Sequence, residues 1–224
     1  MVVILRSPVL GATKNLKESL LQPASLVFVQ DDGFPMNKVS IYKTEGLIIK
    51  SADLGELDRL LTIYTRGYGK IPARTISVRK KESKLKGLIE PFSRANFMLA
   101  KSKTIDIVTD VWPINDYFYL RQNLKNLAHA FYFAELIDKL VVAPERDENL
   151  WRLIERVFAA LNQPRHAASL PQLKTAFEEK LLEFLGHPSF EAQGKNSSAQ
   201  KLFYLQSLAG EGINSPRFLT FVKN

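Results

Sequence analysis

The strongest constraint on the fold is a change of hydrophobic period near Trp112-Pro113. Before this point, short apolar and β-branched runs alternate with turn signals, as in β-strands. After it, apolar residues recur at spacings of three and four, as on the buried face of an amphipathic helix. Strands followed by helices predict an α+β protein with two domains.

Five strand-like runs lie between residues 45 and 112, and turns or short loops join most of them. They read EGLIIKS, DRLLTIYT, IPARTISV, FSRANFMLA and TIDIVTDVW. Gly67 and Gly69 supply the backbone freedom that a tight turn after the second run requires. Five short strands predict a small OB-fold β-barrel, and an SH3-like barrel is the alternative from the pattern alone.

Helices are predicted from residue 117 to the end of the chain. The apolar stripes cover residues 117–141, 148–161 and 170–185, and KLFYLQSLAG and SPRFLTFV are short terminal helices. Asn115 or Asp116 is the expected N-cap of the first helix, because short polar side chains accept backbone N–H groups there. We therefore expect an all-helical C-terminal domain.

These boundaries divide the chain into residues 1–37, 38–112 and 113–224. The first part has weak periodicity and ends in the turn signal Asp31 to Pro35, so we expect a poorly ordered N-terminal extension. Met36 follows it and is a candidate start of the folded chain. No apolar run approaches the ~20 residues of a membrane span, so no membrane partner is expected.

The positive charge of the chain is concentrated in the predicted barrel. The whole chain has a net charge of +8, and residues 38–110 contain 15 basic and 8 acidic residues, a net charge of +7. The densest run is RKKESKLKG, Arg79 to Gly87, for which a solvated loop is the plain alternative. Cations interleaved with aromatic rings are how OB-folds bind single strands. We therefore predict a DNA-contacting face made of Arg59, Arg66, Lys70, Arg74, Arg79, Lys80, Lys81, Lys84, Lys86, Tyr64 and Tyr68.

Residues for catalysis or metal binding are sparse. The chain has no cysteine, and its three histidines are far apart in sequence. RGYGK lacks the length and the Ser or Thr of a phosphate-binding loop. Asp53, Glu56 and Asp58 are conceivable Mg²⁺ ligands of a nuclease, but a solvated turn is the preferred interpretation. We expect no enzyme activity, no cofactor and no metal.

Five motifs of the barrel region occur in an order typical of one bacterial family. They are Thr44-Glu45-Gly46, the DRLLT run from Asp58, the turn from Thr65-Arg66 to Gly69-Lys70, the basic run, and Glu90-Pro91-Phe92. In these five motifs, the barrel region resembles the N-terminal domain of the recombination mediator RecO. FYFAELIDKLV and FEEKLLEFLGHPS resemble the helical domain of that family, so the resemblance covers about residues 38–224.

One segment departs from the family pattern. Many RecO relatives have a four-cysteine zinc module after the helix that contains LLEFLG. Here that segment reads HPSFEAQGKNSSAQK. We therefore expect a zinc module that lacks cysteines and binds no zinc.

The resemblance implies a recombination mediator rather than an enzyme. Family members bind single- and double-stranded DNA, anneal complementary strands, and act with RecR. They engage the C-terminal tail of the single-strand-binding protein SSB and indirectly help RecA to load. The implied location is the bacterial cytoplasm, in association with the nucleoid. A generic RNA- or ribosome-binding OB-fold protein would need the same charges and rings, and stays open as the alternative.

Overall fold

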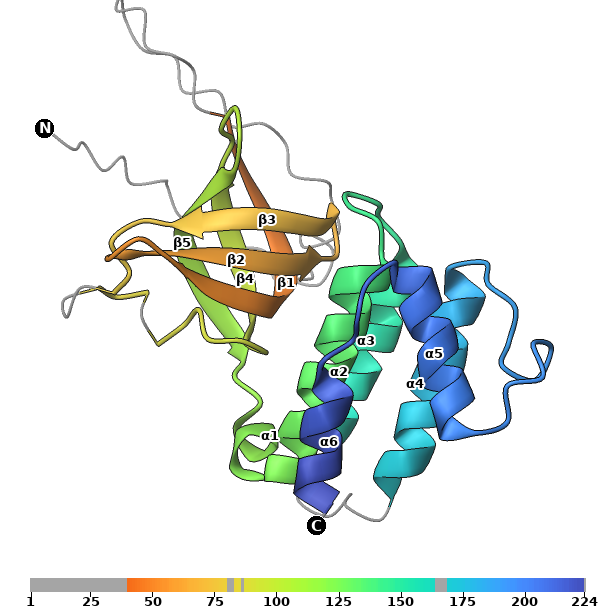
Figure 1. Cartoon of the computed structure of the whole chain (residues 1–224). Coiled ribbons are helices and arrows are strands. Elements are labelled where there is room, and N and C mark those ends of the chain that lie inside the picture. The colour runs from red at the N-terminus through yellow and green to blue at the C-terminus, as the bar shows by residue number, and fades with distance from the viewer. Residues whose placement is uncertain (1–39, 80–82, 86, 164–168, 224) are drawn as a thin grey trace, which may run out of the picture.

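The chain folds into a β-barrel followed by a helical domain (Figure 1). The computed structural model describes residues 40–79, 83–85, 87–163 and 169–223. The extension predicted over residues 1–37 lies outside them. The predicted α+β class, with the barrel first and the helices second, is confirmed.

The barrel closes in the strand order β1-β2-β3-β5-β4. All neighbours are antiparallel except β3 and β5, which pair in parallel through Ala73 with Asp106 and Arg74 with Ile107. A closed five-strand barrel with this crossover is the predicted OB-fold. The strands are β1 Ile41–Leu54, β2 Asp58–Thr65, β3 Gly69–Thr75, β4 Arg94–Ala100 and β5 Asp106–Asn115.

The long strand β1 serves two partners. It pairs with β4 from Ile41 to Leu47 and with β2 from Gly46 to Leu54, with a register shift between Ile48 and Lys50. Such an irregularity bends a strand, so that one strand can follow the barrel wall around two neighbours. Ile48 joins the barrel interior, whereas Leu47 and Ile49 belong to the helical core.

The helical domain is arranged around α2, which contacts α1, α3, α4, α5 and α6. The helix predicted over 117–141 is two helices, because Asn123 is extended (φ −111°, ψ 112°) and accepts the N–H groups of Lys125 and Asn126. The predicted cap at Asn115 or Asp116 was wrong, because Tyr117 occupies the N-cap position of the first helix, and Asn115 accepts the N–H of Tyr117 instead. The helices are α1 Phe118–Gln122, α2 Leu124–Leu140, α3 Glu148–Leu161, α4 Leu170–Phe184, α5 Ser198–Ala209 and α6 Ser215–Lys223.

The barrel and the helices share an apolar contact. Tyr64, on β2, is fully buried and stacks on Trp151 of α3, with ring centroids 6.4 Å apart and planes 10° from parallel. Phe92 enters the helical core beside Phe131 and Phe158, at centroid distances of 4.8 and 5.7 Å. Large buried rings supply most of the free energy of such a contact.

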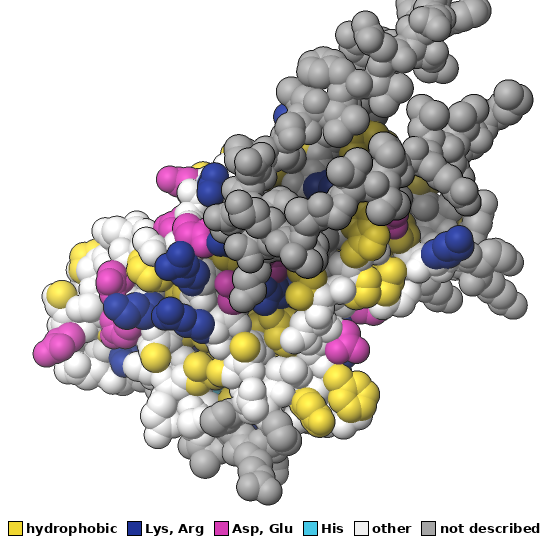
Figure 2. Space-filling view, turned by 180° about the vertical axis from the view of Figure 1, so that it is seen from behind, with side chains coloured by type: hydrophobic (Ala, Val, Ile, Leu, Met, Phe, Trp, Pro, Cys, Tyr) yellow, Lys and Arg dark blue, Asp and Glu magenta, His cyan; other side chains and the backbone are white. Residues whose placement is uncertain are grey.

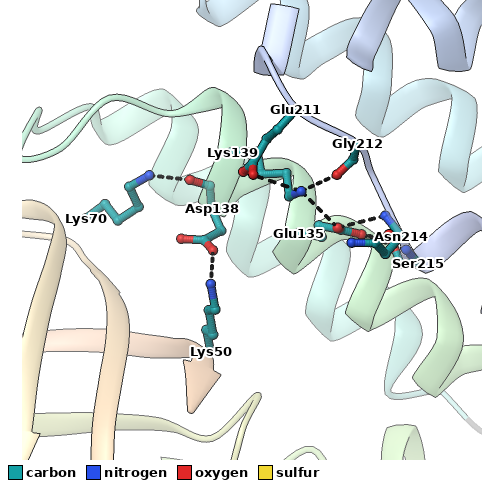
Figure 3. A network of polar contacts seen from close by, with 9 residues as sticks. All are labelled: Lys50, Lys70, Glu135, Asp138, Lys139, Glu211, Gly212, Asn214 and Ser215. Atoms are coloured by element: carbon teal, nitrogen blue, oxygen red, sulfur yellow. Dashed lines mark hydrogen bonds and ion pairs between the residues drawn. The ribbon is translucent and has the colours of Figure 1, made fainter. Parts of the chain in front are cut away.

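Polar groups from the barrel reinforce the same contact. Lys50 and Lys70 both reach Asp138 on α2, the first through the carboxylate at 2.9 Å and the second through the backbone carbonyl (Figure 3). On the other side of α2, Glu135 accepts the N–H groups of Asn214 and Ser215 at the start of α6. Helix α2 therefore connects the barrel to the end of the chain.

The turn between β2 and β3 presses directly on the loop between α2 and α3. Gly69 has a φ of +64°, and a Cβ atom added there would overlap the backbone carbonyl of Glu145. Gly55, in the β1–β2 turn, also has a φ of +64°, but an added Cβ would meet no atom within 4 Å. Gly69 therefore differs from Gly55 in its close contact with the helical domain, and not in its φ angle.

We predict that Gly69→Ala destabilises the protein far more than Gly55→Ala. Each alanine should lower the free energy of unfolding by about 1–2 kcal/mol because of the left-handed backbone. Gly69→Ala should cost roughly 1–3 kcal/mol more, because the loop at Glu145 must move. Urea denaturation measures both. Equal losses would show that the turn does not press on the helical domain.

Candidate nucleic-acid interface

The basic run lies in the connection between β3 and β4, and this connection also completes the barrel core. Val78 and Ile89 are buried in that core, and Leu85 and Leu88 pack against it. Apolar residues on both sides of the run therefore fix the connection to the barrel. Of the predicted lysines, Lys84 is exposed, whereas Lys80, Lys81 and Lys86 lie outside the described residues.

Three of the predicted arginines gather near the β1–β2 turn, where carboxylates meet them. Arg59 lies 3.5 Å from Asp53 and 3.2 Å from Glu90, Arg79 lies 3.4 Å from Asp53, and Arg74 pairs with Asp58. The Ser77 N–H and then Arg74 hold the pKa of Asp58 below its ordinary value. The ion pairs orient the guanidinium groups but also offset their charge.

The same ion pairs bear on the acidic cluster at this turn. Asp53 and Asp58 are both engaged by arginines. Within the described ranges, no three His, Asp or Glu side chains form a group that could bind a metal ion. The arrangement is that of a salt-bridged turn, in which arginine side chains already pair with the carboxylates of Asp53 and Asp58.

Arg66 and Lys70 lie at the domain contact. Arg66 donates two hydrogen bonds to Glu148 at the start of α3, at 2.8 and 3.2 Å. These bonds raise the pKa of Arg66 and lower that of Glu148. Burial lowers the pKa of Lys70, which donates to Asp138 (Figure 3). The structure therefore separates these two cations from the arginines at the β1–β2 turn.

The two predicted tyrosines have different surroundings. Tyr64 is 0% exposed against Trp151, so it offers no face to a base in this arrangement. Neighbouring charges in the sequence are the reason for including Tyr64 in the predicted DNA face. In the structure, the helical domain covers the Tyr64 ring. Tyr68 is 36% exposed and meets Tyr42 edge-on at 4.6 Å.

The sequence pattern does not indicate the helical partners of the barrel cations or one exposed aromatic group. Asp138, Glu148 and Trp151 lie far along the chain from the residues they meet, so no local pattern indicates them. On the outer face of the barrel, the Lys43 ammonium lies 5.1 Å from the centre of the exposed Trp112 ring. The alternation of residues along β5 places the Trp112 side chain on the outer face of the barrel, but does not indicate which group it contacts.

Comparison with known sequences matches both domains. The family described as "Recombination protein O N terminal" matches residues 36–117, and "Recombination protein O C terminal" matches residues 121–219. The chain belongs to the RecO family. The resemblance of the five motifs is thereby confirmed.

Similar relatives are named DNA repair protein RecO. The protein of Pelotomaculum thermopropionicum is 31% identical over 77% of this chain and 67% of its own length. The protein of Moorella thermoacetica is 34% identical over 68% of this chain and 56% of its own length. The protein of Roseiflexus is 36% identical over 66% of this chain and 50% of its own length. The chain thus spans half to two thirds of the length of these relatives. None of its described helices has the length and apolar character to cross a membrane.

We predict that Tyr64 contributes to the stability of the fold and does not contact DNA. Tyr64→Ala should lower the free energy of unfolding by about 3–5 kcal/mol, since it leaves a cavity at the domain contact. Tyr64→Phe should be neutral or slightly stabilising, because the buried Tyr64 hydroxyl has no hydrogen-bond partner within the described part of the chain. Chemical denaturation tests stability, and fluorescence anisotropy with a labelled single strand tests DNA binding. A Tyr64→Phe protein that folds normally but binds DNA much more weakly would contradict this assignment.

Proposed function

We propose that this protein is a DNA repair and recombination mediator that binds single- and double-stranded DNA and anneals complementary strands. The observation that carries the proposal is the match to both parts of the RecO family, over residues 36–117 and 121–219. The names of the relatives state DNA repair. An OB-fold barrel that holds nearly all of the excess positive charge supports the DNA-binding part.

The proposed division of labour follows the two folds. Residues 38–112 act as the nucleic-acid-binding domain, and residues 113–224 act as the helical domain that supports partner binding. The partners are RecR and the C-terminal tail of SSB, and RecA benefits indirectly when SSB-coated DNA is handed over. An acidic tail with an apolar end requires cations beside an apolar groove, which helices can form between them.

The proposed DNA face consists of the basic run and the arginines at the β1–β2 turn. Lysines 80, 81, 84 and 86 supply the charge that attracts phosphates. Arg59, Arg74 and Arg79 are held by carboxylates near them, and can exchange these for phosphate oxygens in bidentate geometry. Arg66 and Lys70 are assigned instead to the domain contact.

The proposed activity is the binding and annealing of DNA strands and the hand-over of SSB-coated DNA to RecA, and not bond cleavage. The pairing of Asp53 and Asp58 with arginines supports this over a Mg²⁺-dependent nuclease. A mediator of this kind acts in the bacterial cytoplasm on nucleoid DNA. A generic RNA-binding protein is the second candidate, and the charge of the barrel serves it equally. Preference for DNA over RNA, and annealing stimulated in the presence of cognate SSB, would separate the two.

We predict that replacing Lys80, Lys81, Lys84 and Lys86 with alanine weakens single-strand binding for all sequences alike. If the run neutralises four phosphates, the slope of log affinity against log salt should become less negative by about 3, at ~0.7 per phosphate. Annealing of complementary strands should slow in parallel. Fluorescence anisotropy across a salt series measures the slope, and circular dichroism checks the fold.

A matched control removes the same charge from the helical domain. Lys125, Arg156, Lys180 and Arg217 are all exposed. Their combined replacement with alanine should change the slope little. Equal effects of the two quadruple variants would mean that only net charge matters. A basic-run variant that binds as tightly as the parent, with the same slope, would show that the run is only a solvated loop.

A further inference from the structure

The outer face of β1, β4 and β5 carries an exposed tryptophan that the domain contact does not use. Trp112 on β5 is 41% exposed and lies opposite Asn96 of β4 in the strand register. Lys43 of β1 pairs with Met98 of β4, and reaches across β4 to the Trp112 ring. We call the outward side chains of Lys43, Asn96, Met98 and Trp112 the Trp112 face. The exposed ring and the ammonium beside it offer a flat apolar surface and a positive charge at one place.

The charges around this face are available to a ligand. In the described part of the chain, Lys43, Lys101 and Lys103 form no ion pair. Lys101 and Lys103 lie in the β4–β5 loop, where the Lys101 ammonium is 5.8 Å from the centre of the Tyr42 ring. Tyr42 in turn meets the exposed Tyr68. Tyr42 is only 8% exposed and belongs to the barrel interior, so this second cation–ring pair is not part of the Trp112 face.

Among the residues that the structure describes, three acidic groups lie on the same side, and a cation offsets one of them, so three lysines remain against Asp106 and Asp110. Arg94 binds Glu45, and Asp106 accepts from the Tyr42 hydroxyl at 2.6 Å. Asp110, opposite Met98, accepts the N–H of Val111. In contrast to the β1–β2 turn, where carboxylates pair with the arginines, the three lysines here keep their charge. This surface attracts anions, and its rings accept flat groups.

We propose that the Trp112 face binds a single-stranded nucleic acid, with one base stacked on Trp112. This deepens the proposed function and rests on it. Lys43 leaves the ring for a phosphate when the base arrives, and Lys101 and Lys103 in the β4–β5 loop add positive charge at the other end of the β4–β5 ladder. The exchange is favourable because a stacked base is worth more than an exposed cation–π contact. The site is separate from the basic run, and gives a bound strand a second point of attachment.

A nucleic acid fits this surface better than an acidic peptide. A peptide with an apolar end would need a groove for its side chains. Two shallow hollows of the barrel lie at the β1–β2 turn, one lined by Leu54 to Asp58 with Arg74, and one by Ser51, Asp53, Arg59, Glu90 and Pro91. The Trp112 face is the outer surface of a sheet, which offers flat rings instead. Figure 2 views the molecule from behind, where hydrophobic, basic and acidic side chains mingle on the surface.

The tryptophan content of the chain allows a direct test. The sequence has two tryptophans, and Trp151 is only 1% exposed. A thymidine oligonucleotide titrated into the full chain should therefore quench Trp112 fluorescence as it binds. Trp112→Phe, which leaves Trp151 as the only tryptophan, should abolish the quenching. The oligonucleotide should still bind this variant within a few-fold of the parent, since a phenylalanine ring also stacks.

Affinity measurements complete the test. Trp112→Ala should weaken single-strand binding about 5- to 150-fold, the worth of one stacked base, without changing the salt slope. Lys43→Ala should make the slope less negative by about 0.7. Phe203→Ala removes an aromatic ring that is 71% exposed on α5, and should leave affinity unchanged. Circular dichroism verifies that each variant folds.

The outcomes distinguish this site from the function on which it rests. If the parent binds the oligonucleotide by anisotropy but its fluorescence is not quenched, the Trp112 site is overturned and DNA binding stands. If an acidic peptide with an apolar end quenches Trp112 and the oligonucleotide does not displace it, the face is a protein-docking surface and the proposal fails. If no oligonucleotide binds at all, the proposed function fails first. Quenching that is lost in Trp112→Phe, together with weaker binding by Trp112→Ala, supports the site.

Discussion

The stacking of Tyr64 on Trp151 is the contact on which the arrangement of the molecule depends. Both rings are almost fully buried, and burial of a large apolar side chain contributes about 1.5–3 kcal/mol. Among the described residues, the Tyr64 hydroxyl and the Trp151 indole N–H have no hydrogen-bond partner, which offsets part of this gain. The half-exposed pair Arg66–Glu148 adds at most ~1 kcal/mol. Apolar burial therefore holds the domains together, and the charges fix their orientation.

This contact decides which cations are free for DNA. Arg66 and Lys70 reach Glu148 and Asp138, so a phosphate would have to replace these helical partners. Among the described residues, the arginines at the β1–β2 turn pair with barrel carboxylates, and Lys43 lies over Trp112 on the barrel itself. The barrel thus presents charge on the surfaces that the helical domain leaves open. The proposed DNA binding therefore does not require the domain contact to break.

Local patterns in the sequence were enough for the elements but not for their assembly. Strand alternation and the three-four helical period identified the barrel and the helices, because each pattern reflects the face that one element buries. Asn123 interrupts a continuous apolar stripe, and only its cap geometry reveals the break. The site was harder to predict. Tyr64 and Tyr68 look alike in sequence, yet Tyr64 is covered by α3, which lies far along the chain. Glu148 of α3, for example, is 82 residues from its partner Arg66.

Hydrogen exchange of the full chain, with and without a thymidine oligonucleotide, tests the central claim most directly. The account predicts that DNA slows exchange in the β3–β4 connection and in β4 and β5. It predicts no change in peptides from the domain contact, around Tyr64 to Lys70 and Glu145 to Arg152. Faster exchange of those contact peptides on DNA binding would mean that the domains separate and that Arg66, Lys70 and Tyr64 turn toward the strand. That result would contradict the account.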